Sequence, residues 1–229
     1  MITRSATIFL GLVAVAFVVV AIAALRNSRT GRARTVTHGI IAAALVVLAS
    51  LTIAFRSPIL SVLGKSDSGT GRTEIWREVI ALAQQRQIVG WGWLSYWIPW
   101  IAPFKNLKKA GGVQPPHAHN AWLDVWLQLG VAGLIIFGAL VFATLVRAYL
   151  LSVDRVITHP GNTGSYSWIT ALPLLVFTAQ LVQSLAESRL LLEGGWMLLV
   201  IWAVRTKLHP FGLEQDHLVN PGRELGRVT

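Results

Sequence analysis

Five apolar segments, each close to the length that crosses a lipid bilayer, constrain this 229-residue sequence more than any other feature. A helix needs about 20 mostly apolar residues to cross about 30 Å of hydrocarbon. The composition agrees, because 54% of the residues are hydrophobic and only 13% are charged, against about 25% charged in a soluble domain. We therefore predict an all-α polytopic integral membrane protein, with spans at residues 8–25, 39–55, 121–151, 168–185 and 190–204.

The first segment has an alternative interpretation. Met-Ile-Thr-Arg is a plausible short basic start for a signal peptide. The segment is long and lacks a small-residue cleavage signal, however, so a permanent span is favoured.

The basic loop between the first two spans predicts how the chain is oriented. Residues 26–34 contain four arginines and no acid, and short loops rich in Lys and Arg stay in the cytoplasm. Counting spans from this loop places the N-terminus and residues 56–119 outside, and residues 152–167 and the tail inside. An external N-terminus without a leader suggests spans upstream, so we expect the chain to be part of a larger bundle.

The predicted organisation has four parts, of which the long external, periplasmic-side loop is the most informative. From residue 56 to 120 it carries eight Lys or Arg residues and three acids. The parts are two N-terminal transmembrane helices with their basic cytoplasmic loop (1–55), the external loop with an amphipathic helix at 72–87 (56–119), three transmembrane helices (120–204) and a cytoplasmic tail (205–229).

Charge and composition exclude several classes of protein. A net charge of +10 would suggest nucleic-acid binding in a soluble protein. Here basic loops beside membrane lipids explain it, and no nucleic-acid partner is expected. The chain has no cysteine, no GxSxG elbow, no HExxH, no P-loop and no acidic cluster for a divalent metal. His117-x-His119 is a weak metal pattern because no third ligand is near in sequence.

The external loop contains a predicted amphipathic helix and several basic residues that could bind an anionic ligand. In the predicted helix 72–87, Ile75, Val79 and Leu82 share one face. Arg72 opens this helix, where a guanidinium can join the N-terminal amides in binding an anion, or can pair with nearby Glu74 or Glu78. Further basic residues either extend this field toward phosphates or are solvated loop residues, and they are Arg77, Arg86, Lys105, Lys108 and Lys109.

A polar stripe enters the third span. Asn120, Asp124 and Gln128 follow at i, i+4 and i+8, so they share a helix face that normally points to the bundle interior or to a water-filled cavity. His119 lies directly above the stripe, where it either caps the helix or accepts a proton at neutral pH. His117 is a second candidate.

Two other segments complete the external side. The aromatic stretch 93–104 is too short and too interrupted by proline to span, and we expect it to lie in the membrane interface. Glu187, Ser188 and Arg189 lie at the predicted outer turn of the last two spans, where they form a local ion pair or line the same external cavity.

Four motifs follow one another in the chain, namely Gly71-Arg72-x-x-x-Trp76, Val89-Gly90-Trp-Gly92, His119-Asn120-x-x-Leu123-Asp124 and Leu129-Gly130-x-x-Gly133. This order, with a large external loop and His-Asn at the start of the next helix, resembles the O-antigen ligase / O-antigen polymerase family of membrane glycan transferases. The resemblance extends over roughly residues 39–204, the C-terminal part of the family's catalytic domain.

The resemblance implies a reaction at the outer face of the inner, or plasma, membrane. A glycan on polyprenyl (undecaprenyl) diphosphate is transferred to the hydroxyl of a glycan or lipid-linked sugar acceptor, and the lipid diphosphate leaves. The resemblance also implies a reaction without metal or cofactor. By this resemblance, His119 corresponds to the catalytic histidine, which acts as a base or only binds phosphate, and Arg72 to the arginine of the Gly-Arg motif. Asn120 and Asp124 then orient the histidine or line the acceptor path, and Arg77 is a further substrate-binding candidate.

Three alternatives to a ligase remain open from the sequence. A polymerase of the same family uses a glycan repeat unit as its acceptor. A transporter or flippase for a lipid-linked glycan needs the same basic cavity but no proton-transferring histidine. A structural partner needs another chain to complete its fold.

Overall fold

The computed structural model describes residues 6–54, 72–94, 97–107, 115–153 and 166–207, and all regular secondary structure in these ranges is helical. Within them, three helices are long and apolar enough to cross a membrane. They are α1 (Ala6–Asn27), α2 (Gly31–Ala54) and α5 (Ala121–Val153). Lipid is the natural solvent for their outer faces, which expose apolar side chains such as Leu12, Val20, Ile40, Val46, Ile136 and Phe142.

The last two expected spans each begin with a 3-10 turn, and neither contains an α-helix long enough to count as a full span. The fourth becomes a 3-10 turn, η3 (Trp168–Ala171), followed by α6 (Leu172–Ser184), which together form one shorter apolar helix. The fifth becomes η4 (Arg189–Leu191) and α7 (Glu193–Lys207). The 15 residues of α7 rise only about 22 Å at 1.5 Å each. The prediction of an all-helical membrane protein is thus confirmed, with three full-length candidate spans.

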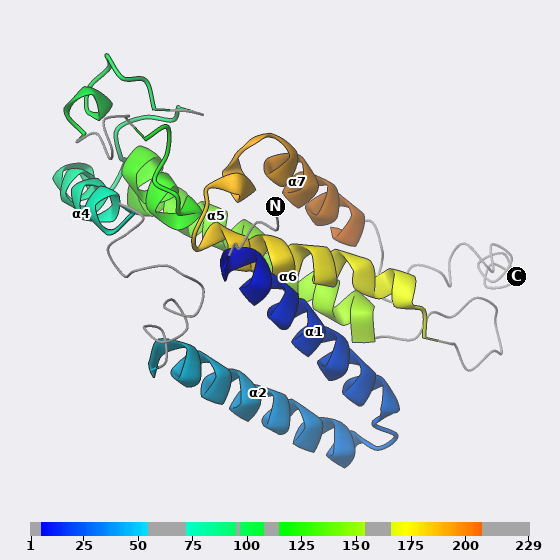
Figure 1. The fold of residues 1–229 in the computed structure, drawn as a ribbon. Coiled ribbons are helices and arrows are strands. Elements are labelled where there is room, and N and C mark those ends of the chain that lie inside the picture. The colour runs from blue at the N-terminus through cyan, green and yellow to red at the C-terminus, as the bar shows by residue number, and fades with distance from the viewer. Residues whose placement is uncertain (1–5, 55–71, 95–96, 108–114, 154–165, 208–229) are drawn as a thin grey trace, which may run out of the picture.

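The long helix α5 is the centre of the bundle (Figure 1). It packs against α1, α6 and α7, while α1 also lies along α6 and contacts α2. One apolar cluster joins α5 to α6, η4 and α7, and a second, nearer the other end, joins it to α1, η3 and α6. Ile22 of α1 is buried in the second cluster, so α1 contributes to the packing of the bundle.

Arg26 ties three elements together at the end of the bundle opposite α4. Its guanidinium donates to the carbonyl oxygens of Ser152 and Ser167 at 2.8 and 2.9 Å and lies over the rings of Tyr166 and Trp168. The last turn of α1, the last turn of α5 and the start of η3 therefore meet at one end. This agrees with the predicted topology, in which the loop after α1 and the segment after α5 share one side of the membrane.

At the other end of α5, residues 72–94, 97–107 and 115–129 pack into a compact unit, here called the cap. It contains α4 (Arg72–Ala83), η1 (Gln84–Arg86), η2 (Phe104–Asn106) and the first turns of α5. The α4 face that the sequence predicts to be apolar is buried through Ile75 and Val79, and Leu82 is partly buried beside them. The buried core of the cap is Ile75, Val79, Ala83, Trp97, Phe104, Leu107, Ala118 and Leu127.

The aromatic stretch 93–104 differs in part from its predicted interfacial placement. Trp97 and Phe104 are buried inside the cap, where their rings stack at 5.5 Å. The backbone N–H of Trp97 also donates to the carbonyl of Pro116 at 2.8 Å. Trp93 and Trp100 remain exposed.

Two glycines allow the cap to pack directly on α5. Gly130 interrupts the helix with φ 66° and ψ −166°, a conformation open essentially only to glycine. The segment 87–92 crosses at this break, and the freed backbone groups of the two segments pair. The bonds run from Trp91 N to Leu127 O, Gly92 N to Gln128 O, Val131 N to Gln87 O and Ala132 N to Ile88 O, at 2.7 to 3.1 Å.

The crossing leaves no room for a side chain on either segment. A Cβ on Gly130 would lie 2.2 Å from the carbonyl oxygen of Ile88, and one on Gly90 would lie 2.4 Å from the backbone of Gln128. These contacts give a physical reason for the spacing of two sequence motifs. The glycine that follows Val89 and the glycine that follows Leu129 face each other.

Substituting Gly130→Ala is expected to destabilise the protein by about 3 kcal/mol, because backbone strain adds to a clash with the segment 87–92. The measurement is thermal unfolding in detergent. Gly138→Ala in the same helix is the matched control, since its Cβ would meet only the Trp122 ring at 4.0 Å. Equal unfolding temperatures for the two variants would contradict the crossing.

Candidate functional site

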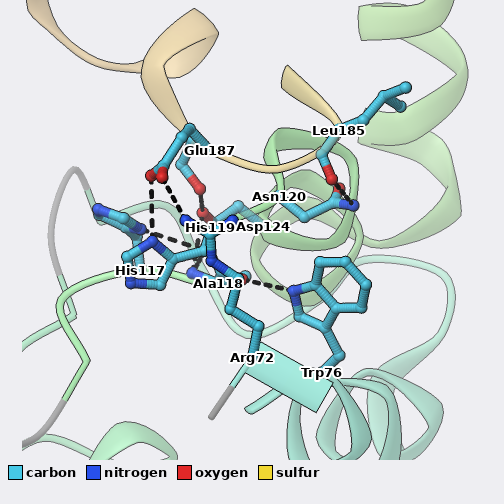
Figure 2. Close-up of polar contacts among 10 residues, drawn as sticks. Arg72, Trp76, His117, Ala118, His119, Asn120, Asp124, Leu185 and Glu187 are labelled. Carbon is cyan, nitrogen blue, oxygen red and sulfur yellow. Dashed lines mark hydrogen bonds and ion pairs between the residues drawn. The ribbon is translucent and has the colours of Figure 1, made fainter. Parts of the chain in front are cut away.

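A polar cluster at the cap end of α5 brings together three distant parts of the chain (Figure 2). The carboxylate of Glu187 contacts two side chains. Its Oε1 accepts a hydrogen bond from Nη2 of Arg72 at 2.5 Å, and its Oε2 lies 3.1 Å from Nδ1 of His119. Arg72 begins α4, His119 precedes α5, and Glu187 lies between α6 and η4. All three side chains are 27 to 29% exposed, so the cluster is half-sheltered and still open to a ligand.

The local sequence holds His119 at a sharp turn into α5. Asn120 is the N-cap of the helix, and its Oδ1 accepts from the backbone N–H groups of Trp122 and Leu123 at 3.0 and 3.1 Å. Its Nδ2 donates to the carbonyl of Leu185 in the loop after α6. His119 itself has a φ of 51°, in the left-handed region that is uncommon for a side chain of this size. Such strain is often found where a residue is held for function.

Asp124 fixes the backbone just before His119. Its buried carboxylate accepts from the backbone N–H of Ala118 at 3.2 Å and from the hydroxyl of Ser188. The carbonyl of Ala118 in turn accepts from the indole N–H of Trp76 at 2.8 Å. The segment before His119 is thus held from α4, from α5 and from the loop that carries Glu187.

The predicted polar stripe on α5 therefore lies against protein. Asp124 and Gln128 are each 2% exposed, and the amide oxygen of Gln128 accepts from the backbone N–H of Leu94. Asn120 and Asp124 act on the backbone beside His119, since among the described contacts neither touches its ring.

The contacts of Arg72 differ from the sequence expectation. The sequence leaves open anion binding or local pairing with Glu74 or Glu78, and within the described residues the ion pair of Arg72 is with Glu187, 115 residues away. Periodicity could not reveal this partner, although its charge and its place at a predicted outer turn were visible in the sequence.

Other predicted substrate-binding residues lie apart from the cluster. Arg77 is exposed on α4, and none of the contacts in the described part of the chain joins it to His119 or Glu187. Arg86 lies over the ring of Trp91 at 4.2 Å, and Lys105 is exposed in η2. Lys108 and Lys109 fall outside the described residues.

His117 lies beside His119 as its hydrogen-bond partner. Its Nδ1 accepts from the backbone N–H of His119 at 3.1 Å, and the two rings meet edge to face at 4.3 Å. Burial and the neighbouring His119 lower the pKa of His117, and the fields of Arg72 and Arg189 add to this against the opposing Glu187. His117 is therefore neutral at pH 7 and can keep accepting that hydrogen bond.

The structure supplies the third metal-ligating residue that the sequence lacked near His117-x-His119. His117, His119 and Glu187 each offer one ligand atom, and these atoms lie within 4.8 Å of one another. The same atoms already have other partners, however, because Glu187 bonds Arg72 and His119, and Nδ1 of His117 accepts from the backbone. The positive charge of Arg72 beside the trio also opposes a cation.

An apolar cavity of about 570 Å³ lies along α5. Val125, Leu129, Gly133, Ile136 and Leu140 line it from one face of α5, Leu191 from η4 and Trp196 from α7. Its lining on α5 begins at Val125, next to Asp124 in the sequence, and runs into the apolar part of the helix.

Comparison with known proteins identifies the family. A family model described as O-antigen ligase matches residues 1–138, which is more than half of the chain. The chain belongs to the O-antigen ligase family. The match begins upstream of the resemblance expected from the motifs and ends within α5, so Glu187 lies beyond it.

A curated relative agrees with membership of the O-antigen ligase family. The exopolysaccharide production protein ExoQ of Rhizobium meliloti (strain 1021) is 26% identical over 136 residues. The match covers 58% of this chain and 29% of the length of ExoQ. No solved structure matches the chain.

The lowered pKa of His117 in this O-antigen ligase family member predicts a pH dependence of stability. The unfolded chain binds a proton near pH 6.5, and the folded chain binds it only at lower pH. Stability is therefore full above about pH 6.5 and is lost as the pH falls below that value. Thermal unfolding between pH 5 and 8 should show a smaller loss for His117→Gln than for the wild type. An equal loss in both proteins would contradict the shift.

Proposed function

We propose that this protein is a membrane glycan ligase of the O-antigen ligase type. It transfers an oligo- or polysaccharide from a polyprenyl diphosphate to a sugar hydroxyl. The acceptor oxygen attacks the anomeric carbon of the donor, the bond from that carbon to the diphosphate oxygen breaks, and the lipid diphosphate leaves with the electron pair. His119 Nε2 takes the proton of the acceptor hydroxyl. The observation that carries the proposal is the grouping of His119, Glu187 and Arg72 in a member of this family.

The donor has a charged and an apolar part, and the protein offers a complement to each. Among the described residues one guanidinium nitrogen of Arg72 bonds Glu187, and the other guanidinium donors suit the negative charge that grows on the leaving diphosphate. Arg77 on the same helix and Asn120 beside the histidine are the further substrate contacts of the proposal. The polyprenyl chain lies in the 570 Å³ cavity, and membrane lipids surround the bundle.

The proposal places the cap outside the inner, or plasma, membrane, on the periplasmic side. The basic loop after α1 supports this orientation, because four arginines in nine residues favour the cytoplasm. In the full topology, the shorter helices α6 and α7 act as a fourth and fifth span, and the tail after residue 205 is cytoplasmic. No metal or cofactor takes part in the proposed chemistry.

The acceptor decides between a ligase and a polymerase. Both break the same bond with the same base, and a polymerase uses a further glycan repeat unit as its acceptor. The name of the relative ExoQ, an exopolysaccharide production protein, favours a polysaccharide as the material handled.

We expect His119→Asn to abolish glycan transfer in cells that depend on this protein, with the polyprenyl diphosphate-linked donor accumulating outside. Asparagine tolerates the left-handed backbone at this position and removes only the basic ring. The measurement is glycan transfer at equal membrane abundance. His38→Asn is the control, since His38 lies on α2 and contacts Tyr149. Unchanged transfer in His119→Asn would contradict its role as base.

A transporter of lipid-linked glycan would behave differently in the same assay. It would tolerate His119→Asn, would fail after charge removal in Arg72→Gln, and would retain the donor on the cytoplasmic side. A purely structural partner would show wild-type transfer with both variants, provided that the chain still accumulates in the membrane.

A further inference from the structure

We infer that Glu187 is a positioning residue that fixes the ring of His119 with Nε2 free to take the acceptor proton, an inference that rests on the proposed glycan transfer. Glu187 lies in the turn between α6 and η4, 68 residues after His119, and beyond the part of the chain that the family model matches. Its carboxylate is the group that contacts the imidazole at Nδ1.

The contact decides which nitrogen of the ring carries the proton. An ionised carboxylate can only accept hydrogen bonds, so the 3.1 Å contact with Oε2 requires a hydrogen on Nδ1 of His119. A neutral ring with hydrogen on Nδ1 has its lone pair on Nε2. The same carboxylate also stabilises the imidazolium that forms once the acceptor proton is taken, as in other carboxylate–histidine pairs.

Arg72 holds the other oxygen of the same carboxylate. With Oε1 bonded to Nη2 of Arg72, the carboxyl group cannot turn away from His119 without breaking that ion pair. One carboxylate therefore sets both the ring that receives the proton and the guanidinium proposed to meet the diphosphate.

The turn that carries Glu187 is held by its neighbours as well. Ser188 donates to Asp124, the carbonyl of Leu185 accepts from Asn120, and the backbone N–H of Glu187 donates to the carbonyl of Gln183 at 2.8 Å. These contacts involve no part of the Glu187 carboxylate. A change confined to that carboxylate should therefore leave the turn in place.

Two other roles for Glu187 are possible in chemical terms and give different results. As a metal ligand with His117 and His119, it would make transfer depend on a divalent cation. As a merely structural ion pair with Arg72, it would affect folding and leave the protonation of the His119 ring unchanged.

The test compares Glu187→Gln and Glu187→Asp with Glu74→Gln, an exposed glutamate in the first turn of α4. We expect Glu187→Gln to lower kcat of glycan transfer by about 10- to 100-fold, with a much smaller change in KM for the lipid-linked donor. Glu187→Asp should restore part of the lost rate, and Glu74→Gln should match the wild type. A kcat within twofold of the wild type for Glu187→Gln would overturn the inference.

A second measurement needs no activity. In the full-length protein labelled with ¹⁵N-histidine, the signal of His119 is identified by its absence from His119→Asn. We expect hydrogen on Nδ1 in the wild type and a shift toward hydrogen on Nε2 in Glu187→Gln. The same protonated nitrogen in both proteins would overturn the inference. If that shift occurs but the wild type transfers no glycan, the control of the ring stands and the proposed function fails.

Treatment with a metal chelator distinguishes a positioning role of Glu187 from a role as a metal ligand. Purified protein treated with EDTA should keep its transfer activity, because proton transfer by a Glu187–His119 pair needs no cation. Loss of activity with EDTA, restored by Zn²⁺, would overturn the inference in favour of a metal site.

Discussion

The close approach of two backbones at Gly90 and Gly130 is the constraint on which the cap and its site depend. A break in a long apolar helix normally leaves backbone groups unpaired, which is costly in or near lipid. Here the segment 87–92 supplies partners on both sides of the break. The first turns of α5, which follow His119 and Asn120, are thereby joined to the cap rather than continued as part of a straight membrane helix. Two residues without side chains thus allow the segment that carries His119 to pack against the cap.

The cluster around His119 concentrates charge without burying it. Arg72, Glu187 and His119 are each about a quarter exposed, so none bears the full desolvation cost of a buried ion. The buried polar groups beneath them, Asp124 and Gln128, are instead bonded to backbone N–H groups and a hydroxyl. The lower layer holds the main chain in place, and the upper layer remains free to meet a ligand.

Sequence reasoning succeeded where the signal was local. Helical periodicity predicted the buried face of α4 and the polar stripe of α5, and hydropathy predicted the long helices. It could not predict that Glu187 reaches His119 and Arg72, because 68 and 115 residues separate them and only tertiary packing joins them. It also did not predict the 3-10 turns that open the last two expected spans. Apolar composition continues through η3 and η4, where the chain forms tighter turns instead of regular helix.

The long separation between His119 and Glu187 also sets an order of assembly. A chain is synthesised and inserted from its N-terminus at about 5–20 residues per second, so Glu187 emerges roughly 3 to 14 seconds after His119. The core of the cap draws only on residues up to Leu127 and can pack within that interval. The histidine therefore gains its carboxylate only when the turn after α6 reaches it. The pair of His119 and Glu187 therefore forms after the cap has packed and before α7 completes the bundle.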